Sequence, residues 1–303
     1  MIKEEKVLLA AFLDAAEDYL AGGYRKDREP WEYTGDPPVE ELSAERARQV
    51  PAGLRGEPRE APTEFPVSPA GHRGGPRGTP PKLHVSPENT GADPEDSLEK
   101  IAGDIDRCTR CELCKTRTHT VPGEGVPHPL VMVVGEGPGA EEDASGRPFV
   151  GRAGQLLDRM LDSRGKIGLS RTSNCYIANI VKCRPPGNRN PQPGEITACT
   201  PFLIRQIKIL MPSVILAAGN TAAKTLLDST EGITRLRGIF TVFSGALFMD
   251  PPVRIPLLPT FHPSALLRDE TLKVPVWEDL KTLRAKLCEV DQAYAAEMAK
   301  TPL

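Results

Sequence analysis

Four short apolar runs alternate with helix-like patterns along residues 98–300. Short apolar runs that end in Gly or polar residues are typical of strands buried in a parallel sheet. The predicted strands are 130–136, 175–182, 214–219 and 255–261. Helical periodicity predicts helices at 98–107, 152–163, 195–211, 221–227 and 276–300. This alternation indicates an α/β fold, which we expect to be a three-layer sandwich around a mainly parallel four-stranded sheet, with an edge hairpin at 241–248.

The first 97 residues have a different pattern. The apolar positions of 1–23 fall on one stripe, which predicts an amphipathic helix that stops at the Gly22-Gly23 pair. Residues 24–97 hold 13 of the 31 prolines and no sustained apolar period, so we expect a disordered linker. The helix would either recruit a partner protein or act as a solubilising extension. One folded domain is expected at 98–290, followed by the end of the last helix and a tail at 291–303.

Composition excludes some classes of protein. No stretch approaches the roughly 18 apolar residues that a membrane span needs. Acidic residues interrupt the apolar N-terminal run, which therefore does not fit a secretory signal, and we expect a cytoplasmic protein. The net charge of −3 with 26% charged residues neither favours nor excludes nucleic acid. A DNA-binding surface would need basic residues that are concentrated locally.

The cysteines favour a metal site. Their odd number, seven, argues against a disulfide framework. Cys108 and Cys111 form a Cys-x-x-Cys pair that Cys183 and Cys199 could join after folding. Four thiolates suit a 4Fe–4S cluster or a structural zinc ion. Cys114 is a rival ligand because Cys111-x-x-Cys114 has the same spacing, whereas Cys175 and Cys288 are expected to be small buried side chains.

A Gly/Pro-rich turn follows the first predicted strand. Residues 135–143 read Gly-Glu-Gly-Pro-Gly-Ala-Glu-Glu-Asp, and 146–151 read Gly-Arg-Pro-Phe-Val-Gly. Such a turn lets backbone amides approach a ligand closely, but it lacks the Lys-Ser/Thr pair of an ATP-binding P-loop. The acidic residues are either a solvated face or metal ligands. Phe149, between Pro and Gly, stands at an unusual place for core packing, which favours a stacking platform.

A second candidate segment, Phe261-His-Pro-Ser-Ala-Leu-Leu-Arg268, follows the last predicted strand. In a doubly wound sheet the ligand sits beyond the carboxyl ends of the strands, where 135–143, Asn179, Asn220 and His262 should meet. Two leucines after the histidine suggest an imidazole for chemistry beside an apolar wedge that unstacks bases.

Together these motifs resemble the family 4, iron–sulfur uracil-DNA glycosylases. The resemblance covers roughly 98–290 and rests on four ordered motifs. They are Val-Pro-Gly-Glu-Gly at 121–125, the two-part glycine-rich motif within 135–151, Asn-Ile-Val-Lys-Cys-Arg-Pro-Pro at 179–186 and His-Pro-Ser-Ala-Leu-Leu-Arg at 262–268. It implies a structural 4Fe–4S cluster on Cys108, Cys111, Cys183 and Cys199, with Cys114 at a non-ligand position. The implied substrate is uracil-containing DNA, and we expect a monomer.

The resemblance also implies roles for the site residues. His262 would act at uracil O2, Asn179 would recognise the uracil edge, and Phe149 would stack on the flipped ring. The other implied roles are water placement by Glu136, backbone contacts from Gly137, exclusion of the thymine methyl group by Glu142, DNA contacts by Arg184, Arg189 and Arg268, and intercalation by Leu266 in preference to Leu267.

Two other functions remain open at this point. One is a uracil-DNA binding protein of the same superfamily that does not turn over or that traps uracil covalently through a His in an extra loop, although 184–195 contains no His. The other is a nucleotide-binding or polymerase-associated module, because a fold alone does not settle function.

Overall fold

The computed structural model describes residues 96–162, 166–243, 254–301 and 303. The N-terminal helix predicted at 1–23 and nearly all of the linker predicted at 24–97 lie outside these residues, as does most of the hairpin predicted at 241–248. Within the described residues, no helix is both long enough and apolar enough to span a bilayer.

The sheet has six strands in the order β1-β3-β2-β4-β6-β5. Its four central strands are parallel, as predicted, and they are β2 (Val131–Gly135), β3 (Cys175–Asn179), β4 (Val214–Ala218) and β6 (Pro256–Thr260). The predicted count of four was too low, because two short antiparallel strands, β1 (Glu124–Gly125) and β5 (Thr241–Val242), pair with the edges. β5 falls at the start of the edge hairpin predicted at 241–248, whereas β1, with only two residues, carries no periodicity that a sequence can reveal.

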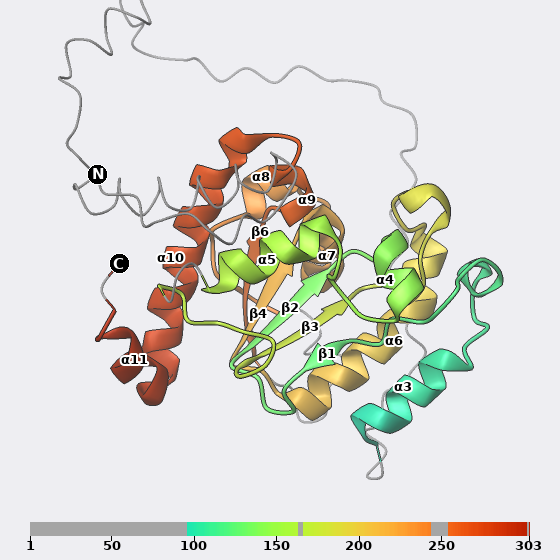
Figure 1. The fold of residues 1–303 in the computed structure, drawn as a ribbon, viewed down its shortest axis with the longest axis horizontal. Helices are drawn as coiled ribbons and strands as arrows, with labels where there is room; N and C mark the ends of the chain where they lie inside the picture. Colours follow the sequence, from blue (N-terminus) through green and yellow to red (C-terminus); the bar gives the residue numbers. More distant parts are fainter. Residues whose placement is uncertain (1–95, 163–165, 244–253, 302) are drawn as a thin grey trace, which may run out of the picture. The chain divides into compact units, whose positions relative to one another are not determined.

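Helices cover both faces of this sheet, which confirms the three-layer sandwich (Figure 1). Alternate residues of β2 point to opposite cores, Met132 and Val134 to one, Val131 and Val133 to the other. The first core contains residues of α3 (Leu98–Asp106), α6 (Pro193–Leu210) and α7 (Asn220–Leu227). The second contains residues of α5 (Arg152–Asp162), α9 (Pro263–Leu266), α10 (Lys273–Val290) and α11 (Gln292–Met298). Shorter helices are η2 (Glu112–Lys115), α4 (Ala140–Ser145), η4 (Pro186–Asn188), α8 (Ile233–Leu236) and η6 (Glu270–Leu272).

The closing segment is two helices rather than the single helix predicted at 276–300. Asp291 has an extended backbone, with φ −136° and ψ 110°, and its side chain accepts a hydrogen bond from the Tyr294 backbone N–H at 2.7 Å. Arg284 of α10 then donates to the Met298 carbonyl at 2.7 Å, which folds α11 back against α10. An Asp N-cap within a continuous apolar period therefore ends one helix and starts the next.

The folded domain starts slightly earlier than predicted. Asp96, which the sequence placed in the linker, accepts two hydrogen bonds from Arg205 of α6, at 2.7 and 2.5 Å. Asp104 of α3 accepts a third from the same guanidinium at 2.8 Å. Arg205 thus fastens the start of α3 to α6.

Candidate active site

A cavity of about 650 Å³ opens at the carboxyl ends of the four parallel strands. This is the edge at which the sequence predicted a ligand site. Its lining includes Glu136, Gly137 and Glu142 from the segment after β2, together with Phe149, Asn179 and His262. The predicted catalytic and substrate-binding residues, which span more than 120 positions of the sequence, therefore share one cavity.

Asn179 is the buried polar group of this cavity. It ends β3 opposite Gly135 of β2, and its side chain is 1% exposed. Among the described residues its Oδ1 atom has no hydrogen-bond partner. A buried amide oxygen without a partner is costly, and such an atom at the wall of a cavity is suited to accept a hydrogen bond from a ligand N–H.

Gly135 makes room for Asn179 and Phe149. A Cβ atom at position 135 would lie 2.5 Å from Asn179 Oδ1 and 2.5 Å from Phe149 Cζ. Any larger residue would push the amide and the ring out of place. Gly135 therefore contributes to the site because its missing side chain leaves space for Asn179 and Phe149.

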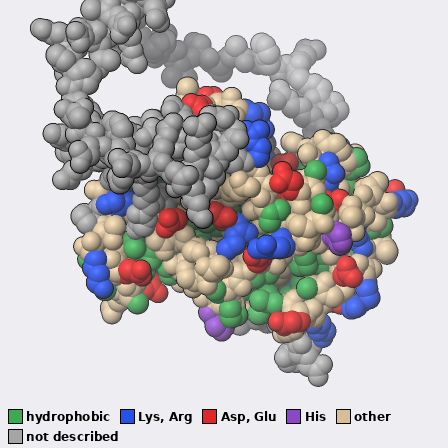
Figure 2. All heavy atoms as spheres, viewed as in Figure 1, with side chains coloured by type: hydrophobic (Ala, Val, Ile, Leu, Met, Phe, Trp, Pro, Cys, Tyr) green, Lys and Arg blue, Asp and Glu red, His purple; other side chains and the backbone are tan. Residues whose placement is uncertain are grey.

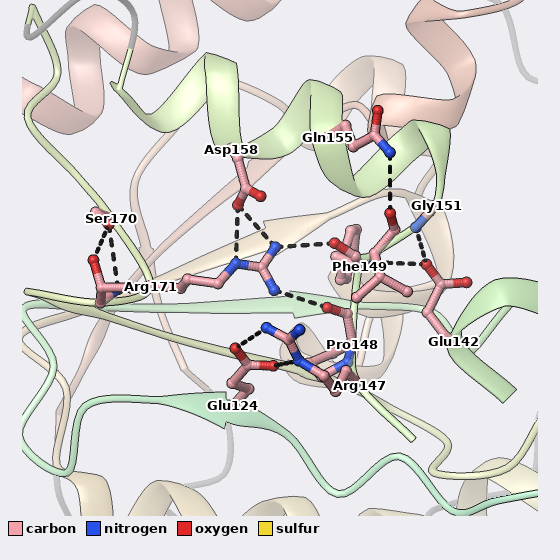
Figure 3. Close-up of polar contacts among 12 residues, drawn as sticks. Glu124, Glu142, Arg147, Pro148, Phe149, Gly151, Gln155, Asp158, Ser170 and Arg171 are labelled. Atoms are coloured by element: carbon pink, nitrogen blue, oxygen red, sulfur yellow. Dashed lines mark hydrogen bonds and ion pairs between the residues drawn. The ribbon is translucent and has the colours of Figure 1, made fainter. Parts of the chain in front are cut away.

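The backbone of Phe149 is held in a left-handed conformation by Arg171. Its φ is 52°, which is unfavourable for a residue with a Cβ atom. Arg171 donates hydrogen bonds to the Pro148 and Phe149 carbonyls, each at 2.9 Å, and pairs with Asp158 of α5 at 2.8 Å (Figure 3). Gly154 lets α5 pack directly on this turn, because a Cβ there would lie 1.9 Å from the Phe149 oxygen. No pattern in the sequence indicates this role of Arg171.

Glu142 ties the two glycine-rich segments together. Its Oε1 atom accepts from the backbone N–H groups of Val150 and Gly151, both at 2.9 Å (Figure 3). Its Oε2 atom accepts from the Gly139 backbone N–H at 3.0 Å. The carboxylate is thus a fixed wall between the Gly139 turn and the segment that carries Phe149.

His262 follows β6 and is the N-cap of α9. The Ser264 backbone N–H donates to its Nδ1 atom at 3.2 Å. Burial and the positive charge of Arg268 lower the pKa of His262 to about 4, so its imidazole is neutral at pH 7. With Nδ1 as acceptor, the ring proton is assigned to Nε2, which leaves a neutral N–H donor. The ring centroid lies 5.5 Å from that of Phe149.

Glu136, directly after β2, accepts a hydrogen bond from the Thr221 hydroxyl at the start of α7. Asn220 was expected at this strand end, whereas a role for Thr221 was not. The turn before it also contacts His262, because a Cβ on Gly219 would lie 2.9 Å from His262 Cβ. Gly219 has a φ of 96°, a conformation that favours glycine.

Gly137 packs against the chain that follows β3. A Cβ at this position would lie 2.7 Å from Val181 Cγ2. A side chain at 137 would therefore displace Val181. Because position 137 has no side chain, the carboxylate that this turn presents to the cavity is that of Glu136.

A second, smaller cavity brings the cysteines together. Cys108, Cys111, Cys183 and Cys199 all line it, and so does Cys114. Arg117 donates to Cys183 Sγ at 3.4 Å, and the Lys182 backbone N–H donates to Cys199 Sγ at 3.2 Å. Burial raises the pKa of Cys199 to about 12 and lowers that of the Lys182 ammonium to about 8. Lys182 Nζ donates to Gln206 at 2.7 Å.

The comparisons with known proteins identify the family. A profile of the uracil DNA glycosylase superfamily matches residues 122–281. The chain belongs to the uracil DNA glycosylase superfamily. It is 42% identical to a type-4 uracil-DNA glycosylase of Sulfurisphaera tokodaii over 193 residues, 62% of this chain and 84% of that relative. It is also 42% identical to a type-4 uracil-DNA glycosylase of Thermotoga maritima over 194 residues, 63% of this chain and 95% of that relative. Such coverage places the chain in the type-4 group, as its motifs predicted.

The type-4 family implies an iron–sulfur cluster, and the cysteine cavity is the place in the described residues where four thiolates could hold it. Hydrogen bonds from Arg117 and Lys182 to two of the sulfurs are of the kind that stabilise thiolate ligands. Within the described residues, no three His, Cys, Asp or Glu side chains are arranged around a single metal ion. A 4Fe–4S cluster spreads its four thiolates over four irons, so its ligands stand further apart. The donor set fits such a cluster, although Cys114 shares the cavity.

The residues predicted to meet DNA differ in their surroundings. In this glycosylase domain Arg268 is exposed and lines the cavity, while Arg184 donates to Asn188 at 2.7 Å. Arg189 makes a bidentate pair with Glu195 of α6, at 2.7 and 2.9 Å, which holds its guanidinium at the start of α6. Basic and acidic side chains are interspersed on the face shown in Figure 2, in keeping with the near-zero net charge.

Leu266, which we predicted to enter the DNA, lies in the core of the domain, and its role in DNA binding stays a prediction. Its side chain is 0% exposed and belongs to the core that also contains Leu157 and Trp277. Leu267, the weaker alternative, is only partly buried. The sequence placed both leucines in a loop, whereas α9 turns the first of them inward.

Proposed function

We propose that this protein is a DNA repair glycosylase that flips uracil out of single- or double-stranded DNA and hydrolyses its N-glycosidic bond. The observation that carries this proposal is Asn179, whose buried Oδ1 lacks a partner among the described residues at the end of β3. This oxygen would accept from uracil N3–H while the amide nitrogen donates to O4. Cytosine has an acceptor at N3 and a donor at C4, so it cannot match this pattern.

Phe149 would form the platform beneath the flipped base. Its ring is buried within the cavity wall, and the backbone is fixed by Arg171. Stacking on an aromatic ring helps to offset the cost of taking a base out of the duplex. The fixed carboxylate of Glu142 would close the pocket against the methyl group of thymine.

Bond cleavage needs help at both ends of the scissile bond. The electron pair of the C1′–N1 bond leaves with uracil, which departs as an anion, and the neutral N–H of His262 would stabilise the charge at uracil O2. A water oxygen bonds to C1′, and the proton that this water loses ends on the uracil anion. Glu136 would position that water and stabilise the positive charge on the sugar. Gly137 and its neighbours would supply backbone contacts.

A 4Fe–4S cluster is proposed for the cysteine cavity, with Cys108, Cys111, Cys183 and Cys199 as ligands. When bound, the cluster would act as a structural cross-link between the segment at 108–111 and the segment at 183–199. Arg117 supports this role, since its guanidinium donates to the Cys108 carbonyl at 2.8 Å and to Cys183 Sγ. The cytoplasmic location and the monomeric state also remain predictions.

Uracil release from synthetic oligonucleotides tests the proposal. The protein should release uracil from single- and double-stranded DNA and leave an abasic site, and matched cytosine and thymine oligonucleotides should stay intact. Asn179→Ala should lower the rate by at least about 100-fold, because the recognition hydrogen bonds are lost. Binding without release would favour a non-catalytic binder, and a protein–DNA adduct that survives denaturing electrophoresis would favour a covalent trap.

A further inference from the structure

The turn between β4 and α7 lies against both candidate catalytic side chains. Gly219 leaves space for His262, and two residues later the Thr221 hydroxyl donates to Glu136 Oε2. Thr221 stands in the first turn of α7, an eight-residue helix. One short segment, remote in sequence from both residues, therefore hydrogen-bonds the carboxylate and leaves the space that the histidine side chain needs.

The hydrogen bond from Thr221 decides how the Glu136 carboxylate is used. Among the described residues, Glu136 makes no other side-chain hydrogen bond. One oxygen is therefore engaged by the threonine, and Oε1 is the oxygen left for a water molecule in the cavity that Glu136 lines.

We propose that Thr221 is a positioning residue for catalysis, which fixes the rotamer of Glu136 so that Oε1 faces the attacking water. This inference rests on the proposed uracil-DNA glycosylase activity. Thr221 does not line the cavity, so it acts through Glu136 rather than on the substrate.

Three variants of the full-length protein test this role. Thr221→Val keeps the shape of the side chain and removes its hydroxyl, so the single-turnover rate of uracil release should fall about 10-fold to 100-fold, the loss expected for one hydrogen bond to a charged group. Binding of uracil-containing DNA should stay within about 3-fold of the unaltered protein. Thr221→Ser, which retains the hydroxyl, should restore the rate to within about 3-fold. Thr225→Val makes the same chemical change one turn along α7 and should leave the rate unchanged.

A double variant separates positioning from packing. Because Thr221 is inferred to act through Glu136, adding Thr221→Val to Glu136→Ala should slow release no further. Independent, multiplying losses would overturn the inference, and so would equal rates for Thr221→Val and the unaltered protein, or a failure of Thr221→Ser to restore the rate. Absence of uracil release by the unaltered protein would overturn the proposed function and this inference with it.

Discussion

Arg171 holds the stacking platform, and replacing it with alanine should slow uracil release and destabilise the domain. Its hydrogen bonds to the Pro148 and Phe149 carbonyls are both 2.9 Å long. Hydrogen bonds from a charged donor contribute about 1.5–3 kcal/mol each. The ion pair with Asp158 adds little, under about 1 kcal/mol, because the Asp158 side chain is 47% exposed.

The backbone strain at Phe149 turns this loss into a loss of activity. A left-handed φ of 52° costs a residue with a Cβ atom about 1–2 kcal/mol. Without the two hydrogen bonds, that strain is no longer offset, and the Phe149 ring occupies the stacking position in only a fraction of the molecules. We expect Arg171→Ala to lower the free energy of unfolding by about 3 kcal/mol, which is a fall in melting temperature of about 6–12 °C. Loss of stacking, about 1–3 kcal/mol per base, should slow single-turnover release by about 10-fold to 100-fold.

Two control variants isolate the effect of the carbonyl contacts. Thermal unfolding and single-turnover uracil release are measured for each variant. Arg147 makes a similar bidentate pair, with Glu124 at 2.8 and 2.7 Å, but does not hold the Phe149 backbone (Figure 3). Asp158→Ala removes the ion pair of Arg171 and leaves its carbonyl contacts. Arg147→Ala and Asp158→Ala should each cost under about 1 kcal/mol and less than about 3-fold in rate. Equal losses of stability and rate in Arg171→Ala and Arg147→Ala would refute this role of Arg171. So would a loss in Asp158→Ala as large as that in Arg171→Ala.

Four further outcomes are expected. Cys183→Ser should abolish the iron content of anaerobically purified protein, about four irons per chain, whereas Cys114→Ser should leave it unchanged; zinc in place of iron would contradict the cluster. Leu266→Ala should lower the free energy of unfolding by about 2–5 kcal/mol as a core truncation, whereas Leu267→Ala should slow release from duplex DNA more than from single strands, and equal slowing on both would exclude a wedge at 267. Because the folded protein protonates His262 only near pH 4 and the unfolded chain near 6.5, stability should fall as the pH drops through this window, and an NMR titration midpoint of His262 near 6.5 would refute the assignment. A chain that starts at Asp96 should fold and release uracil, and one that starts at Leu98 should melt at a lower temperature because the Asp96–Arg205 pair is lost; equal melting temperatures would show that this pair contributes nothing.

The positions of Asn179, Glu136 and His262 could be predicted because each residue lies at the carboxyl end of a predicted parallel strand. Each comes at or just after the end of an apolar run, and parallel strands bring such ends to one edge of the sheet. Arg171 and Thr221 could not be predicted, since their roles come from contacts made across the fold after packing. For Thr221 the sequence held one signal, a glycine followed by an amide and a hydroxyl side chain in the Gly219-Asn-Thr segment, which follows β4 at that same edge. The inward turn of Leu266 likewise depends on how α9 packs.

Two segments of the chain connect the cysteine cavity to the base pocket, so we expect the proposed cluster to help hold the pocket in place. On one side Thr118, next to Arg117, donates its backbone N–H to Asp143 at 2.9 Å, and Asp143 directly follows Glu142 in the sequence. On the other side the chain that leads to Cys183 packs against Gly137 through Val181. We therefore expect a change at the cysteines to reach both walls of the pocket through these two segments. Loss of the cluster should disturb base recognition even though no thiolate lines the pocket, which makes the cysteine variants a test of this link as well as of iron binding.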